Sequence, residues 1–274
     1  MEQETFIRLL RQPVNMLVRR PVGMLTGSQT RGLPLDMPAH APSDAEFRVT
    51  LDPDPRNTYS GSHCSDFGNY MAMTGVYDTA GTSHPGWAGA TEFFPGVGKF
   101  KLNPTSSSQN VWECPCAPGI FYDSQSACES APPCRPGLGG CLEKCGGSPG
   151  VCLTVTVKLP ITGPIKISLL RWVPASPATP CQTAISTFDA AVLAHENHHK
   201  ADAQKILAAA KNAPAKTFRV CAKTRQDAGV KLQQLVRKSV QDQVDAMSQA
   251  YSDSISAFHA TPQGQPVLMD CTPC

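Results

Sequence analysis

The segment from Thr183 to Asn212 constrains the fold more than any other part of the chain, because it reads as one long helix with an apolar face. Its apolar residues recur at spacings of three and four positions: Ile185, Phe188, Val192, Ala203, Ile206 and Ala210. This periodicity is typical of an amphipathic helix that packs against a core. Thr183 is expected to cap the start of the helix, and Pro214 to prevent it from continuing.

Two histidines lie on this apolar face. The helix contains the run His195-Glu196-Asn197-His198-His199, in which the first and last histidines are one turn apart and should point into the protein. Two imidazoles so placed can bind one zinc ion. Glu196 lies about 100° round the helix from His195, where it would hold a water on the metal and accept its proton. Two buried core histidines that are merely hydrogen-bonded would give the same pattern, and the motif alone leaves that alternative open.

A second amphipathic helix is predicted from about Thr224 to Phe258. Its apolar stripe consists of Leu232, Val236, Val240, Val244, Met247, Tyr251, Ile255 and Phe258. Residues at such spacings share one face of a helix, so this face should also be buried. In the first helix, Asp202 lies about one turn after His199 and is expected to orient the ring of that histidine.

The second helix is where a third metal ligand is expected, because a catalytic zinc ion usually has three protein ligands and one water. A tight hairpin between the helices would bring Asp242 or Asp245 to the motif, whereas a longer excursion through residues 212–223 would bring His259. We favour His259, because a histidine that follows an amphipathic helix directly is well placed to face inward. Asp253 is the alternative ligand, or a carboxylate that orients one. A histidine exposed on the surface is the remaining interpretation.

The HExxH motif, paired with the downstream stretch Tyr251-x-Asp253-x5-His259, resembles zincin metallopeptidases. It is most similar to secreted bacterial zinc-dependent peptidases, over about residues 150–265. The resemblance implies a zincin fold, a bound zinc ion and hydrolysis of peptide bonds, with Glu196 as the general base. On position alone, Tyr251 is assigned as a hydrogen-bond donor to the developing oxyanion.

Composition limits the classes of partner. The 274 residues carry a formal net charge of +2 and no block of lysine or arginine, which argues against nucleic acid. No apolar run approaches the length of a membrane span. Twelve cysteines are unusual in a reducing compartment, and an even number allows six disulfides. We therefore expect an extracytoplasmic protein. Because no cleavable signal peptide is visible, it is expected to be secreted, or injected by a delivery apparatus.

The chain divides by composition into four parts. These are a basic arm at residues 1–45 that is a signal, a prosegment or a disordered terminus, an irregular β-rich part at 46–111, a Cys/Gly/Pro-rich insert at 112–152, and the core at 153–274. In the core, 153–157 and 165–169 alternate as strands and are predicted to form a hairpin around the turn at 160–164. The edge strand of such a sheet is expected to pair with an extended substrate.

The insert carries seven cysteines among prolines and glycines, and too few apolar residues for a core of its own. Disulfides are favoured over a zinc knuckle, because the spacing between Cys114 and Cys116 and between Cys141 and Cys145 is not Cys-x2-Cys. The insert is expected to act as a lid or substrate loop, or to be a crosslinked surface excursion. A further disulfide is predicted between Cys181 and Cys221, bracing the motif helix from both ends.

Together these features predict an α+β, zincin-like zinc endopeptidase that acts on a protein or peptide substrate and is exported as a bacterial toxin or effector. Two other classes stay open. One is a non-catalytic, disulfide-stapled binding module, and the other is a zinc hydrolase that acts on peptidoglycan.

Overall fold

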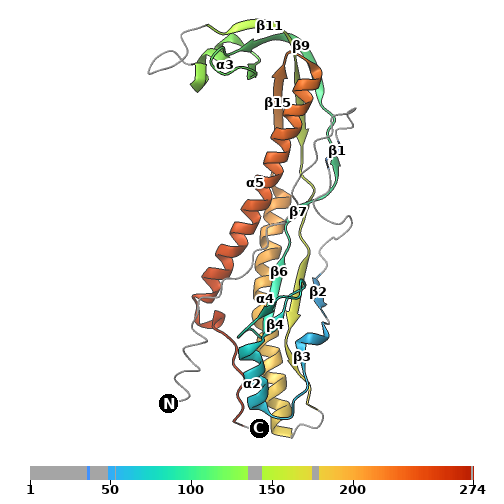
Figure 1. Ribbon diagram of the computed structural model, residues 1–274, viewed down its shortest axis with the longest axis vertical. Coiled ribbons are helices and arrows are strands. Elements are labelled where there is room, and N and C mark those ends of the chain that lie inside the picture. The colour runs from blue at the N-terminus through green and yellow to red at the C-terminus, as the bar shows by residue number, and fades with distance from the viewer. Residues whose placement is uncertain (1–35, 38–48, 53, 135–143, 175–178, 273) are drawn as a thin grey trace.

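The fold is a mixed α/β arrangement built along two long antiparallel helices, in a computed structural model that describes residues 36–37, 49–52, 54–134, 144–174, 179–272 and 274 (Figure 1). The predicted arm at residues 1–45 lies outside the described residues, apart from Asp36 and Met37. Within the described ranges, no helix has both the length and the apolar character needed to cross a bilayer.

Helix α4, Thr179–Asn212, carries the histidine motif and is 34 residues long. Its end agrees with the prediction, two residues before Pro214. Its start does not, since Thr183 lies inside the helix. The helix begins one turn earlier because Pro180 is tolerated in a first turn, where no intrahelical N–H bond is required.

Helix α5, Arg225–His259, is 35 residues long and confirms the second predicted helix. Thr224 caps it by accepting a hydrogen bond from the backbone N–H of Asp227 at 3.1 Å. The whole predicted apolar stripe is buried, together with Ala228, Gly229 and Ser248. The stripe packs against α4 and against the strands described next, so α5 connects all parts of the main core.

The strands β9 (Thr105–Glu113), β11 (Gly146–Val157) and β15 (Lys216–Ala222) form an antiparallel sheet with β11 in the centre. The two-residue strand β10 (Phe121–Tyr122) bridges β9 and β15. One face of the sheet buries Leu153, Val155 and Val157 against α5. The alternation predicted for residues 153–157 is therefore correct, and it reflects a sheet with one buried face.

The predicted hairpin between residues 153–157 and 165–169 is wrong. Strand β13 (Ile165–Leu169) pairs instead with β6 (Gly89–Phe93), antiparallel, and with β2 (Val49–Asp52), parallel. Strand β11 pairs through residues 146–154 with β9 and through residues 151–157 with β15. The segment between β11 and β13 forms the short strand β12 (Ile161–Thr162), which pairs with β7 (Gly96–Val97).

A second core lies at the other end of α4, around helix α2 (Cys64–Met73). Its centre is Phe67, which stacks on Trp172 and meets Phe188 edge to face. The remaining short elements are β1 (Asp36–Met37), η1 (Pro55–Asn57), β3 (Thr58–Tyr59), β4 (Val76–Tyr77), β5 (Ser83–His84), β8 (Phe100–Lys101), α3 (Gln125–Ser130), η2 (Pro132–Cys134), β14 (Arg171–Trp172) and η3 (Pro262–Gly264).

The cysteines form disulfides, as expected, and none in the described part of the chain is free. The predicted bond between Cys181 and Cys221 is wrong. Cys221 bonds Cys152, its register partner on the neighbouring strand, and Cys181 bonds Cys274. With Cys64–Cys271, the latter bond attaches the end of the chain to the second core. In the insert, Cys114 bonds Cys134 and Cys128 bonds Cys145.

Candidate metal centre

Three histidine side chains converge on one point between α4 and α5. The Nε2 atoms of His195, His199 and His259 are each 3.2 Å from the other two. His195 and His199 come from neighbouring turns of α4, and His259 is the last residue of α5. The structure therefore brings together the three residues that the sequence proposed as ligands, 60 or more positions apart for the third.

The triangle has the dimensions of a zinc site. Nitrogen ligands lie about 2.0–2.1 Å from zinc, and in a tetrahedron two of them are then about 3.3 Å apart. The observed 3.2 Å separations match this value. His199 is fully buried, whereas His195 and His259 are partly exposed, so solvent reaches two of the three ligand residues. Three protein nitrogens and one open position are the ligand set of a catalytic zinc ion.

Core histidines that are merely hydrogen-bonded would leave this cluster poorly satisfied. The three Nε2 atoms have only one another, and a neutral imidazole offers each neighbour either one N–H or one lone pair. A metal ion would satisfy all three Nε2 lone pairs at once, which favours a metal centre over a core cluster.

The electrostatics of the site keep the histidines neutral. Burial, and to a smaller extent the neighbouring histidines, lower the pKa of His195 to about 4 and that of His199 to about 3. Burial also lowers the pKa of His259. Because only the neutral ring has a free lone pair, all three are ready to bind a cation at neutral pH.

Phe258 holds the rings in place. Its ring stacks on His198 with centroids 3.8 Å apart, and lies 5.0 Å from the ring of His195 and 5.1 Å from that of His199. It immediately precedes His259, so one buried aromatic residue contacts both α4 ligands and sets the end of α5. The rings are therefore oriented by packing, where other metal sites use a carboxylate.

Glu196 faces strand β6. Its side chain is 3% exposed, and its Oε2 accepts a hydrogen bond of 2.7 Å from the hydroxyl of Thr91. Burial raises the pKa of Glu196 to about 7, while the Thr91 hydrogen bond opposes the rise. A β-carbon added to Gly89 would lie 2.6 Å from Oε1 of Glu196, so only glycine lets the strand approach the motif this closely.

Tyr251 fastens the same strand to α5. It is buried, its hydroxyl donates to the backbone carbonyl of Thr91 at 3.1 Å, and its ring meets Phe93 edge to face. Burial raises its pKa, so the hydroxyl keeps its proton. The hydroxyl that the sequence assigned to an oxyanion is thus engaged with the backbone of β6.

The predicted supporting carboxylates do not reach the ligands. Asp202 pairs with Lys205 at 3.0 Å and with His198 at 3.5 Å along the surface of α4. It does not orient the ring of His199. Asp253 accepts a hydrogen bond from Gln249 at 2.8 Å on the exposed face of α5. The other ligand candidates bond along α5 in the same way, Asp242 to Lys238 and Asp245 to Gln241. Partners one turn away on the same helix surface outcompete the site for each carboxylate.

A cavity of about 390 Å³ lies elsewhere, where β10 and β15 meet the start of α5. Its lining includes Phe121, Arg219 and Lys231, and no residue that the sequence predicted for the site. The chemistry of the histidine triangle, not the size of this cavity, therefore identifies the candidate centre.

Comparison with protein-family models, with curated proteins and with solved structures gave no match for this chain. The assignment of the centre therefore rests on its own geometry. The class that this geometry defines is a three-histidine site with a carboxyl on the residue next to one ligand.

Proposed function

We propose that this chain is a zinc-dependent endopeptidase whose metal is held by His195, His199 and His259. The observation that carries the proposal is the triangle of Nε2 atoms with 3.2 Å sides, in which His195 and His259 are partly exposed. A zinc ion bound there would supply a Lewis acid that makes water nucleophilic near neutral pH.

Glu196 is the proposed general base. A carboxyl whose pKa is about 7 is present in both protonation states near neutral pH. It can therefore accept a proton from the attacking water and return it to the leaving amine. The Thr91 hydroxyl, 2.7 Å from Oε2, fixes the orientation of the carboxylate and leaves Oε1 for the proton.

Strand β6 is the proposed substrate-binding element. It ends the three-stranded sheet β2-β13-β6 and packs against α4 at the motif. An extended peptide can add to the edge of a sheet through backbone hydrogen bonds, largely independent of its side chains. The carbonyl of Thr91 already accepts from Tyr251, so a substrate would use other groups of the strand.

An extracytoplasmic location, by secretion or injection, is part of the proposal. Five disulfides in the described part of the chain are compatible with it. Titration of free thiols in protein recovered from the export route should find none, and reduced cysteines throughout would contradict this part.

The catalytic proposal is tested by cleavage of an unfolded protein by wild type and by Glu196→Gln. Glutamine can still accept the Thr91 hydrogen bond but cannot take a proton. The variant should therefore retain zinc and lose turnover by at least about hundredfold, the lower end of what general bases contribute. Glu129→Gln, on α3, is the matched control and should cut like wild type. Equal cleavage by wild type and Glu196→Gln would contradict the assignment, as would cleavage that survives a chelator.

A further inference from the structure

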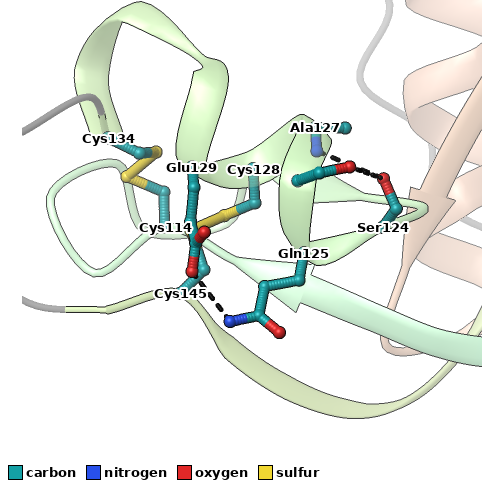
Figure 2. The surroundings of a disulfide bond; sticks show 9 residues. Cys114, Ser124, Gln125, Ala127, Cys128, Glu129, Cys134 and Cys145 are labelled. Atoms are coloured by element: carbon teal, nitrogen blue, oxygen red, sulfur yellow. Dashed lines mark hydrogen bonds between the residues drawn. A yellow bond between two sulfur atoms is a disulfide. The ribbon is translucent and has the colours of Figure 1, made fainter.

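The insert between β9 and β11 has a small core made of cysteine side chains. We call its described residues, 114–134 and 144–145, the cap. Its buried centre consists of Cys114, Cys128, Cys134 and Cys145, which are 0%, 0%, 4% and 6% exposed. The apolar residues packed on this centre are only partly buried: Trp112, Ala117, Tyr122 and Ala131. Figure 2 shows the four cysteines facing one another as two disulfides.

The four sulfurs share one small volume. Those of Cys128, Cys134 and Cys145 all lie within 4.8 Å of one another, and that of Cys114 is bonded to Cys134. Zinc–thiolate bonds are about 2.3 Å long, so sulfurs in a tetrahedral site are about 3.8 Å apart. The separations of the Cys134 sulfur from the sulfurs of Cys128 and Cys145 exceed that value by about an ångström at most.

We infer that the reduced cap is a binding site for one thiophilic divalent metal ion, with Cys114, Cys128, Cys134 and Cys145 as its ligands. Reduction by a dithiol breaks the two S–S bonds, each disulfide taking up two electrons and two protons while the dithiol becomes a disulfide. Binding of Zn²⁺ then forms four zinc–sulfur bonds and releases the four thiol protons. Disulfides and metal would therefore hold the same cap in two redox states.

The chain connectivity supports this exchange. Each ligand comes from a different local segment: Cys114 follows β9, Cys128 lies in α3, Cys134 ends η2 and Cys145 precedes β11. Reduction would leave these segments joined only by the few partly buried apolar residues, too little for a small domain to stay folded. An ion that binds four thiolates would connect the same points, and its binding free energy would become folding free energy.

The site is separate from the histidine centre and does not depend on its function. The cap lies by the beginning of α5, where Lys231 donates to the carbonyl of Gly119, whereas His259 is the last residue of that helix (Figure 1). The 35-residue helix spans about 50 Å. The cap site is therefore independent of whether the protein is a peptidase.

The test is a Co²⁺ titration of the full-length protein, oxidised and then reduced with a dithiol under anaerobic conditions. The near-ultraviolet charge-transfer band of cobalt–thiolate bonds is the readout. The band should be absent in the oxidised protein and appear with one equivalent in the reduced protein. Reduced Cys128→Ser should lose the band or at least about tenfold in affinity, because removing a ligand should cost no less than removing a group that orients one. Reduced Cys271→Ser, which alters a disulfide outside the cap, should keep it.

Three further results decide the inference. His199→Ala should leave the thiolate band unchanged, which separates this site from the proposed catalytic one. No band in the reduced wild type would overturn the inference, as would a full band in Cys128→Ser. Far-ultraviolet circular dichroism monitors the helices during the titration. If the reduced chain has lost α4 and α5 and takes up no metal, the site does not exist and the inference fails.

Discussion

Replacing Gly89 with alanine is the sharpest perturbation of the proposed base. The new β-carbon would lie 2.6 Å from Oε1, 2.7 Å from Cγ and 2.9 Å from Cδ of Glu196. Ordinary contacts begin near 3.4 Å, so the carboxyl or strand β6 has to move. The shift needed is roughly 0.8 Å, and a misplacement of about 1 Å reduces turnover about hundredfold. The overpacking should also lower the free energy of unfolding by about 1–3 kcal/mol.

The assay compares kcat for an unfolded protein substrate, bound zinc by native mass spectrometry, and thermal stability. Gly89→Ala should lose most of its turnover and keep its zinc, because Glu196 is not a ligand. Gly98→Ala is the matched control, since its β-carbon would meet nothing closer than 3.5 Å. This variant should change neither kcat nor the bound zinc. A folded, zinc-loaded Gly89→Ala with wild-type kcat would refute the reasoning that places the base against β6.

Three further predictions concern one hydrogen bond, one open helix position and the bound metal. Tyr251→Phe removes the donor to the Thr91 carbonyl and should cost about 1–3 kcal/mol in urea unfolding; an unchanged midpoint would mean that this bond contributes nothing. Gly68→Ala, in α2 with nothing within 4 Å of the added carbon, should gain about 0.4–1 kcal/mol in the same assay; a loss would contradict the open space. Chelation should remove about 2.7 kcal/mol if zinc is present at a hundred times its Kd, seen as a lower Tm that added zinc restores.

The helices were predictable because their signals are local. The apolar stripes of α4 and α5 and the helix N-cap residue Thr224 can all be identified within a few turns of sequence. The predicted start of α4 was too late, because threonine is a common N-cap residue and Thr183 resembles one. Pro180 is acceptable in a first turn, so the helix begins earlier. The pairing of β13 could not be predicted, because its partners β2 and β6 precede it by many tens of residues.

The residues of the site also fall into those that local sequence predicts and those that depend on distant contacts. The spacing of His195 and His199 follows from helix geometry, and His259 from its place at the end of α5. Thr91 was missed because it is 105 residues from Glu196, in a strand with no motif of its own. Asp202 was misassigned because spacing along a helix identifies its neighbours but not which of them it pairs with. It pairs with His198 and Lys205. Sequence could not supply these rotamers and long-range contacts.

The most direct measurement is the zinc content of the oxidised full-length protein, determined for wild type and for alanine variants of the cluster. The account predicts one zinc ion per chain in wild type, and its loss in both His199→Ala and His259→Ala. His198→Ala, whose ring stacks on Phe258 but is not part of the triangle, should keep the ion. Wild-type zinc content in His259→Ala, or no zinc in any folded protein, would contradict the metal centre on which the proposed function depends.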